Sequence, residues 1–417
     1  MGKHLVANAF VAAFLAMAAA ALTVALVPQH GSWWNAAVQL SILGGFVPLI
    51  YAVNIRIVPV FARREWTSLN ALRVQVSLGI VGAWLTFASQ LGDRIQFERL
   101  GLTAVLLAGL LFFKNVVTLF RQPAATKPAL PLPYPDQKKV DQIATRFTRV
   151  SGAYLLLGLI FGLLKSFWTP DWGRWDLVWA HTMLVGFLLS MISGVTYHVL
   201  TRWTDRKWKS VRAIQVHFRI SATGLPVMLL ALVGDFDRLF QIAGPLQALA
   251  LALLLFNALP LVGALPPLTK FSWIAASLFL ITGISLGGMF ALDPVLGVRL
   301  RMAHAEINLF GWGGLLISGM ALYLVPRFAG ASLFWPRLAR IELSMLTLGA
   351  IIGATSLGLR GYGHGSESAI WIGQLMVAGS FLLMAGIVGM TFRSAKPVPA
   401  QMVQIQRVSK PIQLSGM

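Results

Sequence analysis

The sequence predicts an all-α, polytopic membrane protein with about twelve transmembrane helices in three repeated four-helix arcs. Hydrophobic residues make up 57% of the chain and charged residues 12%, and the mean hydropathy is +0.73. These values lie outside the usual range of soluble domains. Apolar runs long enough to cross a hydrocarbon core of ~30 Å recur along the whole length. A gap-free internal repeat then sorts these runs into three groups.

The apolar runs leave no room for a large soluble domain, so the whole chain, 1–417, is interpreted as one integral membrane domain. The runs lie near residues 5–27, 33–61, 70–91, 100–120, 146–167, 175–201, 212–234, 239–263, 271–292, 300–326, 338–359 and 368–391.

The formal net charge of +20 is distributed in a way that indicates a membrane orientation. Lys and Arg gather in alternate loops and in the C-terminal tail, whereas most Asp and Glu fall in the other loops. The positive-inside rule then places both termini in the cytoplasm, and we expect a bacterial-type inner membrane. Anionic membrane lipid is a sufficient partner for the basic loops, so we expect no nucleic acid partner.

An internal repeat is visible in three stretches, 38–61, 180–203 and 305–328. Without gaps, the alignment superposes Gly44, Gly186 and Gly311, and its register continues into the following helix. It divides the chain into units of about 1–121, 143–264 and 270–392. A Pro-rich segment, 121–142, is predicted to be an irregular cytoplasmic linker, because proline denies a helix its hydrogen bonds. Residues 393–417 form a predicted cytoplasmic tail.

The repeat register brings polar residues into equivalent sets within otherwise apolar helices. Ionisable groups inside a bilayer are costly and usually face a cavity or the bundle interior. His198 and His217 lie near helix ends, and we interpret each as a structural residue held by a hydrogen bond. Glu306 and Glu342 could form ion pairs with Arg301 and Arg340, respectively. The three sets are Gln39, His181 and Glu306; Gln75, His217 and Glu342; and Arg56, His198 and Tyr323.

The stretch "AHAE" at 303–306 carries the most specific signal. His304 and Glu306 are about 200° apart around a helix, so they point to opposite sides. His181 and His198 are about 25 Å apart along one helix and cannot share a metal. His304 could instead meet His181, since both lie near the outer ends of repeat-equivalent helices. The chain has no cysteine, which excludes thiolate metal sites and covalent c-type haem.

These residues resemble the haem–copper oxidase subunit I superfamily, which has twelve helices, three pseudo-repeated arcs and a His-x-His pair on its tenth helix. The NnrS-type haem- and copper-containing membrane proteins are a related possibility. "AHAE" is similar to the His-x-His motif with Glu306 in place of the second His. The resemblance covers nearly the whole chain in helix count, but motif similarity is confined to about 30 residues.

The resemblance implies a non-covalent, b-type haem and a role for His304 as its axial ligand. It also implies a metal-binding or distal role for His181, which matches the copper-ligating His of the sixth helix. Gln39 and Glu306 occupy the places of the low-spin haem ligands and are poor haem ligands. The adjacent His pair that completes a copper site is missing, so a full copper site is unsupported.

The function implied is respiratory electron transfer or oxygen or nitric oxide chemistry, with a cytochrome or another electron-transfer subunit as partner. If the chain is an enzyme, it would be an oxidoreductase of the cytochrome oxidase or nitric oxide reductase type. Two alternatives remain open. One is a transporter for a metal or small solute, for which Pro48, Pro226 and Pro245 are candidate helix breaks. The other is a cofactor-free accessory subunit.

Overall fold

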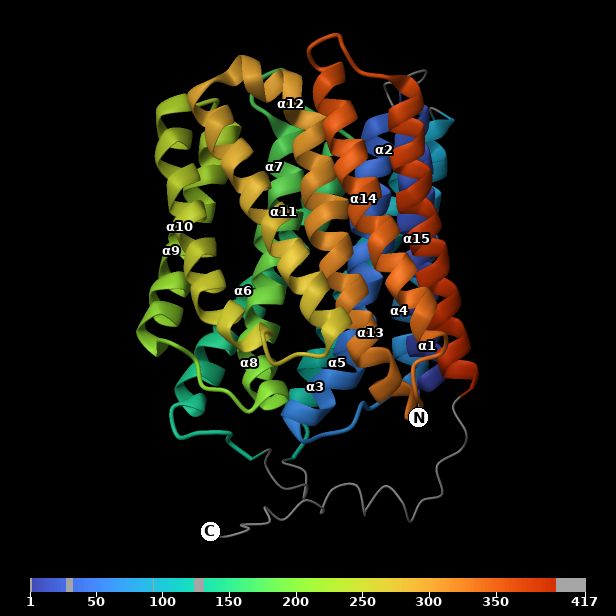
Figure 1. Ribbon diagram of the computed structural model, residues 1–417, viewed down its shortest axis with the longest axis vertical. Helices are drawn as coiled ribbons and strands as arrows, with labels where there is room; N and C mark the ends of the chain where they lie inside the picture. The colour runs from blue at the N-terminus through green and yellow to red at the C-terminus, as the bar shows by residue number, and fades with distance from the viewer. Residues whose placement is uncertain (1, 28–32, 93, 124–130, 395–417) are drawn as a thin grey trace.

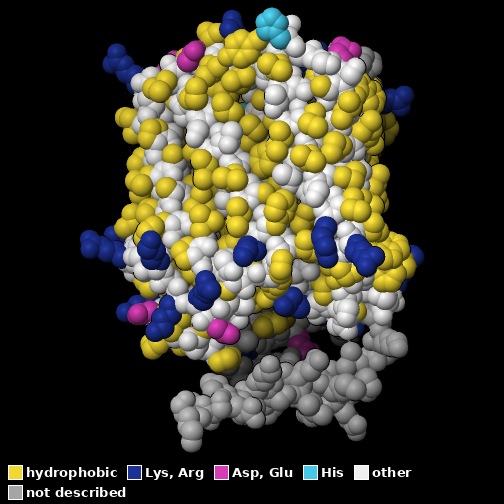
Figure 2. Space-filling view, viewed as in Figure 1, with side chains coloured by type: hydrophobic (Ala, Val, Ile, Leu, Met, Phe, Trp, Pro, Cys, Tyr) yellow, Lys and Arg dark blue, Asp and Glu magenta, His cyan; other side chains and the backbone are white. Residues whose placement is uncertain are grey.

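The structure is a computed structural model that describes residues 2–27, 33–92, 94–123 and 131–394. These residues form twelve helices long and apolar enough to cross a membrane, which confirms the predicted all-α membrane fold. The helices stand side by side in one bundle (Figure 1). Lys and Arg side chains gather toward the end of the bundle at which the chain begins (Figure 2). We call this the basic end and the other the opposite end.

Each unit contributes four membrane-spanning helices in the same order, and the second of each is interrupted by a π-helical segment. The first unit comprises α1 (Lys3–Leu26), α2 (Trp33–Gln39) continuing through η1 (Leu40–Phe46) into α3 (Val47–Ala62), α4 (Leu69–Leu91) and α5 (Ile95–Arg121). The second comprises α6 (Gln137–Lys165), α7 (Trp175–His181) with η2 (Thr182–Leu189) and α8 (Ser190–Thr204), α9 (Val211–Gly234) and α10 (Asp237–Val262). The third comprises α11 (Pro267–Leu292), α12 (Pro294–Glu306) with η3 (Ile307–Gly314) and α13 (Leu315–Ala329), α14 (Pro336–Arg360) and α15 (Glu367–Arg393).

The three π-helical segments begin at Leu40, Thr182 and Ile307, which the repeat alignment makes equivalent. The same helices also end at equivalent residues, Ala62, Thr204 and Ala329. The residue after each of these ends has a positive φ, and in the third unit that residue is Gly330, which adopts this conformation without strain. The structural correspondence therefore follows the sequence register without gaps. A π-helical segment within an α-helix is rare and frequently marks a functional region.

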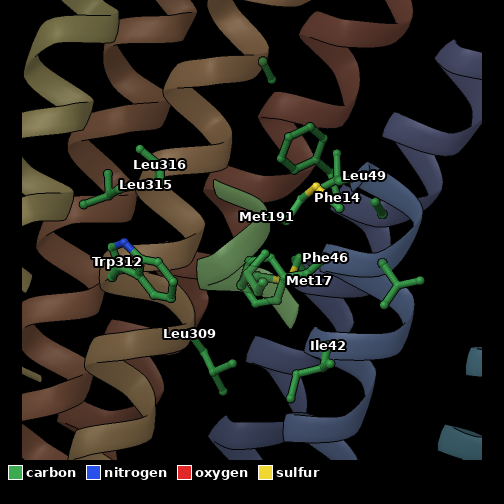
Figure 3. Packing of buried hydrophobic residues seen from close by; sticks show 14 of the residues in the cluster. Phe14, Met17, Ile42, Phe46, Leu49, Met191, Leu309, Trp312, Leu315 and Leu316 are labelled. Atoms are coloured by element: carbon green, nitrogen blue, oxygen red, sulfur yellow. The ribbon is translucent and has the colours of Figure 1, made fainter. Parts of the chain in front are cut away.

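The interrupted helices form the centre of the bundle. They are the most deeply buried of the twelve spans that the described residues form. The units also close into a ring, because α5 contacts α6, α10 contacts α11, and α15 returns to α1. Figure 1 shows α1 and α15 side by side although they lie at the two ends of the sequence. Side chains from all three units meet in the core (Figure 3).

The predicted linker, 121–142, is correct only in part. Helix α6 begins at Gln137, so residues 137–142 are helical rather than irregular. The reason is that the last proline of the segment is Pro135, beyond which nothing in the sequence prevents helix formation. Residues 124–130 of the linker and 395–417 of the tail lie outside the described residues.

Candidate functional site

His181 and His304 lie at corresponding ends of the interrupted helices of the second and third units. His181 is the last residue of α7, and His304 lies in the last turn of α12, so each precedes a π-helical segment. Their side chains are close enough to interact electrostatically. The two histidines singled out from the sequence therefore lie in the same part of the bundle, each just before a π-helical segment.

The His181 ring is oriented by the turn that precedes it. Its Nδ1 lies 2.8 Å from the backbone carbonyl oxygen of Leu177. A carbonyl oxygen can only accept, so Nδ1 carries the proton and donates it. The Nε2 atom then keeps its lone pair, which is the arrangement by which proteins commonly prepare a histidine for metal coordination.

The His304 ring faces α11 and leaves a nitrogen without a partner. Its Nδ1 is buried and has no partner within hydrogen-bond distance, although the backbone of Gly283 is near enough to interact with the ring. The ring packs edge-on against Phe290 at a centroid distance of 5.3 Å, and a methyl group added at Gly287 would lie 3.3 Å from Cε1. A methyl group at Gly288 would meet no atom within 4 Å. The site thus combines a buried imidazole nitrogen without a close hydrogen bond with a surface of α11 formed by Gly287 and Phe290.

Glu306 points to the other side of the helix, as its spacing from His304 predicts. It is 0% exposed, and its Oε1 accepts a hydrogen bond of 2.9 Å from Nε2 of Gln374 on α15. Gly353 on α14 makes room for this pair, because a methyl group there would lie 2.8 Å from Oε1. The second carboxylate oxygen, Oε2, has no partner.

The ion pairs considered for the two buried glutamates do not form. No salt bridge joins Glu306 to Arg301 or Glu342 to Arg340 in the part of the chain that the structure describes. Glu342 is 0% exposed, and neither of its carboxylate oxygens makes a hydrogen bond, although the Ser318 hydroxyl is near enough to interact. The pairing fails because both carboxylates point into the third unit, where no arginine reaches them.

Gln39, the first-unit member of the set that contains His181 and Glu306, ends α2. Its Oε1 is buried without a hydrogen-bond partner. Gln39 and Glu306, which occupy the places that the resemblance assigns to the low-spin haem ligands, thus each have a buried side-chain oxygen without a hydrogen-bond partner.

The remaining candidates belong to the basic half of the bundle. His198 lies 3.2 Å from Asp141, which also binds both terminal nitrogens of Arg202. His217 is 2% exposed, and its Nδ1 lies 2.8 Å from the Tyr197 hydroxyl. These partners agree with the structural interpretation of both histidines.

Tyr323 also has a structural environment, since its ring packs on Trp203 at 4.7 Å and lies 3.5 Å below the guanidinium of Arg327. The structure does not bring Tyr323, His198 or His217 to the His181–His304 site.

Sequence reasoning missed three residues that complete these environments: Gln374, Gly353 and Asp141. Asp141 had a usable signal, because it is an isolated carboxylate at the start of a membrane helix. No group of three or more His, Cys, Asp or Glu suited to a metal ion occurs among the described residues.

Comparison with known proteins finds a similarity of fold but none of sequence. No family model and no curated protein matches the sequence. The structure is similar to a cryo-EM structure of a haem–copper terminal oxidase dimer, with a TM-score of 0.60 and 12% identity. The alignment covers 94% of this chain and 83% of the other. At this identity the likeness establishes the fold, and the chain therefore has the twelve-helix fold of a haem–copper terminal oxidase, in divergent form.

Proposed function

We propose that this chain is a haem-binding integral membrane protein in which His304 is the axial ligand and His181 faces the same group from the other side. The observation that carries this proposal is the placement of two imidazoles at corresponding ends of the interrupted helices of two units, near enough to interact electrostatically, with Nε2 of His181 left unprotonated and Nδ1 of His304 without a close hydrogen bond. Haem iron commonly takes histidine. A haem bound here would supply one-electron transfer or the binding of oxygen or nitric oxide.

The described residues fit one haem better than the full set of oxidase cofactors. A buried nitrogen without a partner costs free energy, and coordination would relieve that cost. The His304 ring packs against Gly287, and the next residue of α11, Gly288, has open space beside it. By contrast, Glu306 is engaged by Gln374, which disfavours a second haem on that side. Copper has no three-ligand site among the described residues.

The chain's own groups would hold and insulate such a haem. The Leu177 carbonyl fixes the His181 tautomer, and Phe290 restricts rotation of the His304 ring. Asn308 donates a 2.7 Å hydrogen bond to the backbone oxygen of His304, which stabilises the turn at which α12 becomes π-helical. These contacts would orient the ligand before the cofactor binds.

The proposed setting is a bacterial inner membrane with the basic end in the cytoplasm, following the positive-inside rule. Both α1 and α15 reach that end, so both termini would be cytoplasmic (Figure 1). Anionic lipid would contact the basic loops. Because the ligand set for a second haem is missing, a cytochrome or another electron-transfer subunit would have to deliver electrons.

One observation favours the transporter alternative. Glu342 is fully buried with no hydrogen bond to its carboxylate, and intramembrane acids of this kind often serve ion or proton movement. A transporter usually has a broken helix at its midplane. Helices α9 and α10 continue through Pro226 and Pro245, so these prolines do not supply a break.

The absorption spectrum of protein purified from cells supplied with ample haem separates these functions. A Soret band that co-purifies with the monodisperse protein supports the haem proposal. Bound metal ion without haem favours the transporter, and a protein that is folded but colourless and metal-free favours the accessory subunit.

A further inference from the structure

A cavity of about 110 Å³ lies among the three interrupted helices, on the basic side of their π-helical segments. Its walls come from α3, α8 and α13, with Phe10 of α1 and Trp273 of α11. Leu316 and His304 are 12 residues apart in the sequence, which is about 18 Å along a helix. The cavity is therefore separate from the His181–His304 site.

Equivalent residues of all three units line this cavity. Four sets of repeat-equivalent residues, each with one member from every unit, form much of its wall. They are Leu49, Met191 and Leu316; Ile50, Ile192 and Ile317; Val53, Val195 and Met320; and Asn54, Thr196 and Ala321. The second and third of these sets are only partly buried although they lie in the middle of the bundle. Their partial exposure is what a central cavity produces. The space is therefore a consequence of the repeat rather than a local packing fault.

Side-chain size explains why the centre is filled at one level and open at the next. At the π-helical level, Phe46 extends into the place left by Gly313, where a methyl group would lie 2.5 Å from the Phe46 ring. Met17 similarly lies against Gly45. Figure 3 shows Phe46, Met17 and Met191 in this part of the core. One turn further toward the basic end, all three units present aliphatic residues of intermediate size, and none of them crosses the centre.

The chemistry of the wall restricts the occupant. No charged residue lines the cavity, and apart from two tryptophans its polar residues are Asn54 and Thr196. A buried water needs two to four polar partners, whereas apolar cavities stay dry and can hold xenon or benzene. The volume, about 110 Å³, is smaller than the ~150 Å³ cavity that accepts benzene. The occupant must therefore be small and uncharged.

We propose that this central cavity binds small apolar molecules of the size of xenon or a diatomic gas such as dioxygen or nitric oxide. Phe46 of the π-helical segment and Trp203, which packs against Tyr323, are both part of its wall. The binding energy would come from dispersion contacts with the aliphatic wall. The proposal does not rest on haem binding, because no residue of the His181–His304 site takes part.

Crystals of the full chain pressurised with xenon test the proposal directly. We expect xenon density between Ile50, Ile192 and Ile317. Val195→Phe, which places a ring into the space, should abolish that density, and Val53→Phe should do so from a different unit. Leu249→Phe is the matched control, because Leu249 is 48% exposed on α10 and lies outside the cavity wall, so xenon should remain.

Two results would overturn the proposal. One is a wild-type cavity without xenon in crystals that bind xenon at other apolar positions. The other is a cavity occupied by ordered water or by a lipid chain that xenon does not displace. The wild-type result decides the matter even if both phenylalanine variants fail to fold. Because the readout is xenon position rather than colour, failure here is distinguishable from failure to bind haem.

Discussion

Glu306 accepts a hydrogen bond from Gln374 in the fully buried interior of the third unit, while His304, two residues earlier, faces α11. In a His-x-His motif, the i, i+2 spacing directs two imidazoles to opposite sides of a helix. Here the same spacing directs the imidazole of His304 to one side and the carboxylate of Glu306 to the other. The two sides of the helix should therefore respond differently to mutation.

Replacing Glu306 should affect stability more than haem content. Glu306→Ala leaves Nε2 of Gln374 buried without an acceptor, which costs about 1–3 kcal/mol. Glu306→Gln keeps an acceptor oxygen and should be tolerated. Thermal unfolding of the purified variants measures the difference, and Glu367→Gln at the exposed start of α15 is the control. A well-folded Glu306→Ala protein that has lost its haem would contradict this division of roles.

Three repeat-equivalent glycines should differ in their tolerance of alanine. A methyl group at Gly82 would lie 2.7 Å from the Gly101 carbonyl oxygen, and one at Gly349 would lie 2.8 Å from that of Gly373. At Gly224 the nearest atom, at 2.8 Å, is the end of the Gln247 side chain, which can move. We expect Gly82→Ala and Gly349→Ala each to cost about 1–3 kcal/mol and Gly224→Ala clearly less.

Thermal unfolding in one lipid or detergent system ranks the three variants. Gly386→Ala is the control, because its methyl group would meet no atom within 4 Å. Equal losses at all three positions would show that the helix pairs are packed differently from the structure.

The network around Asp141 should stabilise the basic half of the second unit. Asp141 receives two hydrogen bonds from Arg202, of 3.0 and 2.8 Å, and lies 3.2 Å from His198. Asp141→Asn should lower the free energy of unfolding by about 1.5–3 kcal/mol, because it removes charge-assisted bonds. Arg202→Lys should not preserve stability, since lysine cannot form the paired bond. Asp136→Asn, at an exposed position, should be neutral, and an equal loss there would refute the specific role of Asp141.

The proposed orientation can be read from single cysteines, because the native chain has none. Gln122→Cys follows α5 at the basic end, and Asp171→Cys lies between α6 and α7 at the opposite end. A membrane-impermeant maleimide added to intact cells should label position 171 and spare position 122 until the membrane is opened. Labelling of both from the same side would refute the orientation.

Much of the fold could be predicted because hydrophobic length and repeat register are properties of the sequence itself. The alignment that superposes Gly44, Gly186 and Gly311 also makes Ala62, Thr204 and Ala329 equivalent, and the structure ends the three helices at these residues. The π-helical segments could not be foreseen, since apolar composition is similar in either kind of helix. The start of α6 was placed too late because the Pro-rich composition was extended past Pro135.

The site was less predictable than the fold because it depends on how helices are rotated against each other. The spacing of His304 and Glu306 was sufficient to predict that they face different sides. It could not identify Gln374, which is 68 residues away and reaches Glu306 only through the packing of α15. For the same reason, arginines near Glu306 and Glu342 in sequence were poor guides to their partners in space.

The most direct test of the account is the haem-to-protein ratio of His304→Ala compared with His364→Ala, each purified from the membrane after expression with ample haem. His364 lies in the exposed loop between α14 and α15 and is the matched control. We predict a Soret band and wild-type haem content for His364→Ala, and loss of haem with normal membrane insertion for His304→Ala. A wild-type protein without haem, or a His304→Ala protein that keeps it in full, would contradict the assignment of His304 as the axial ligand.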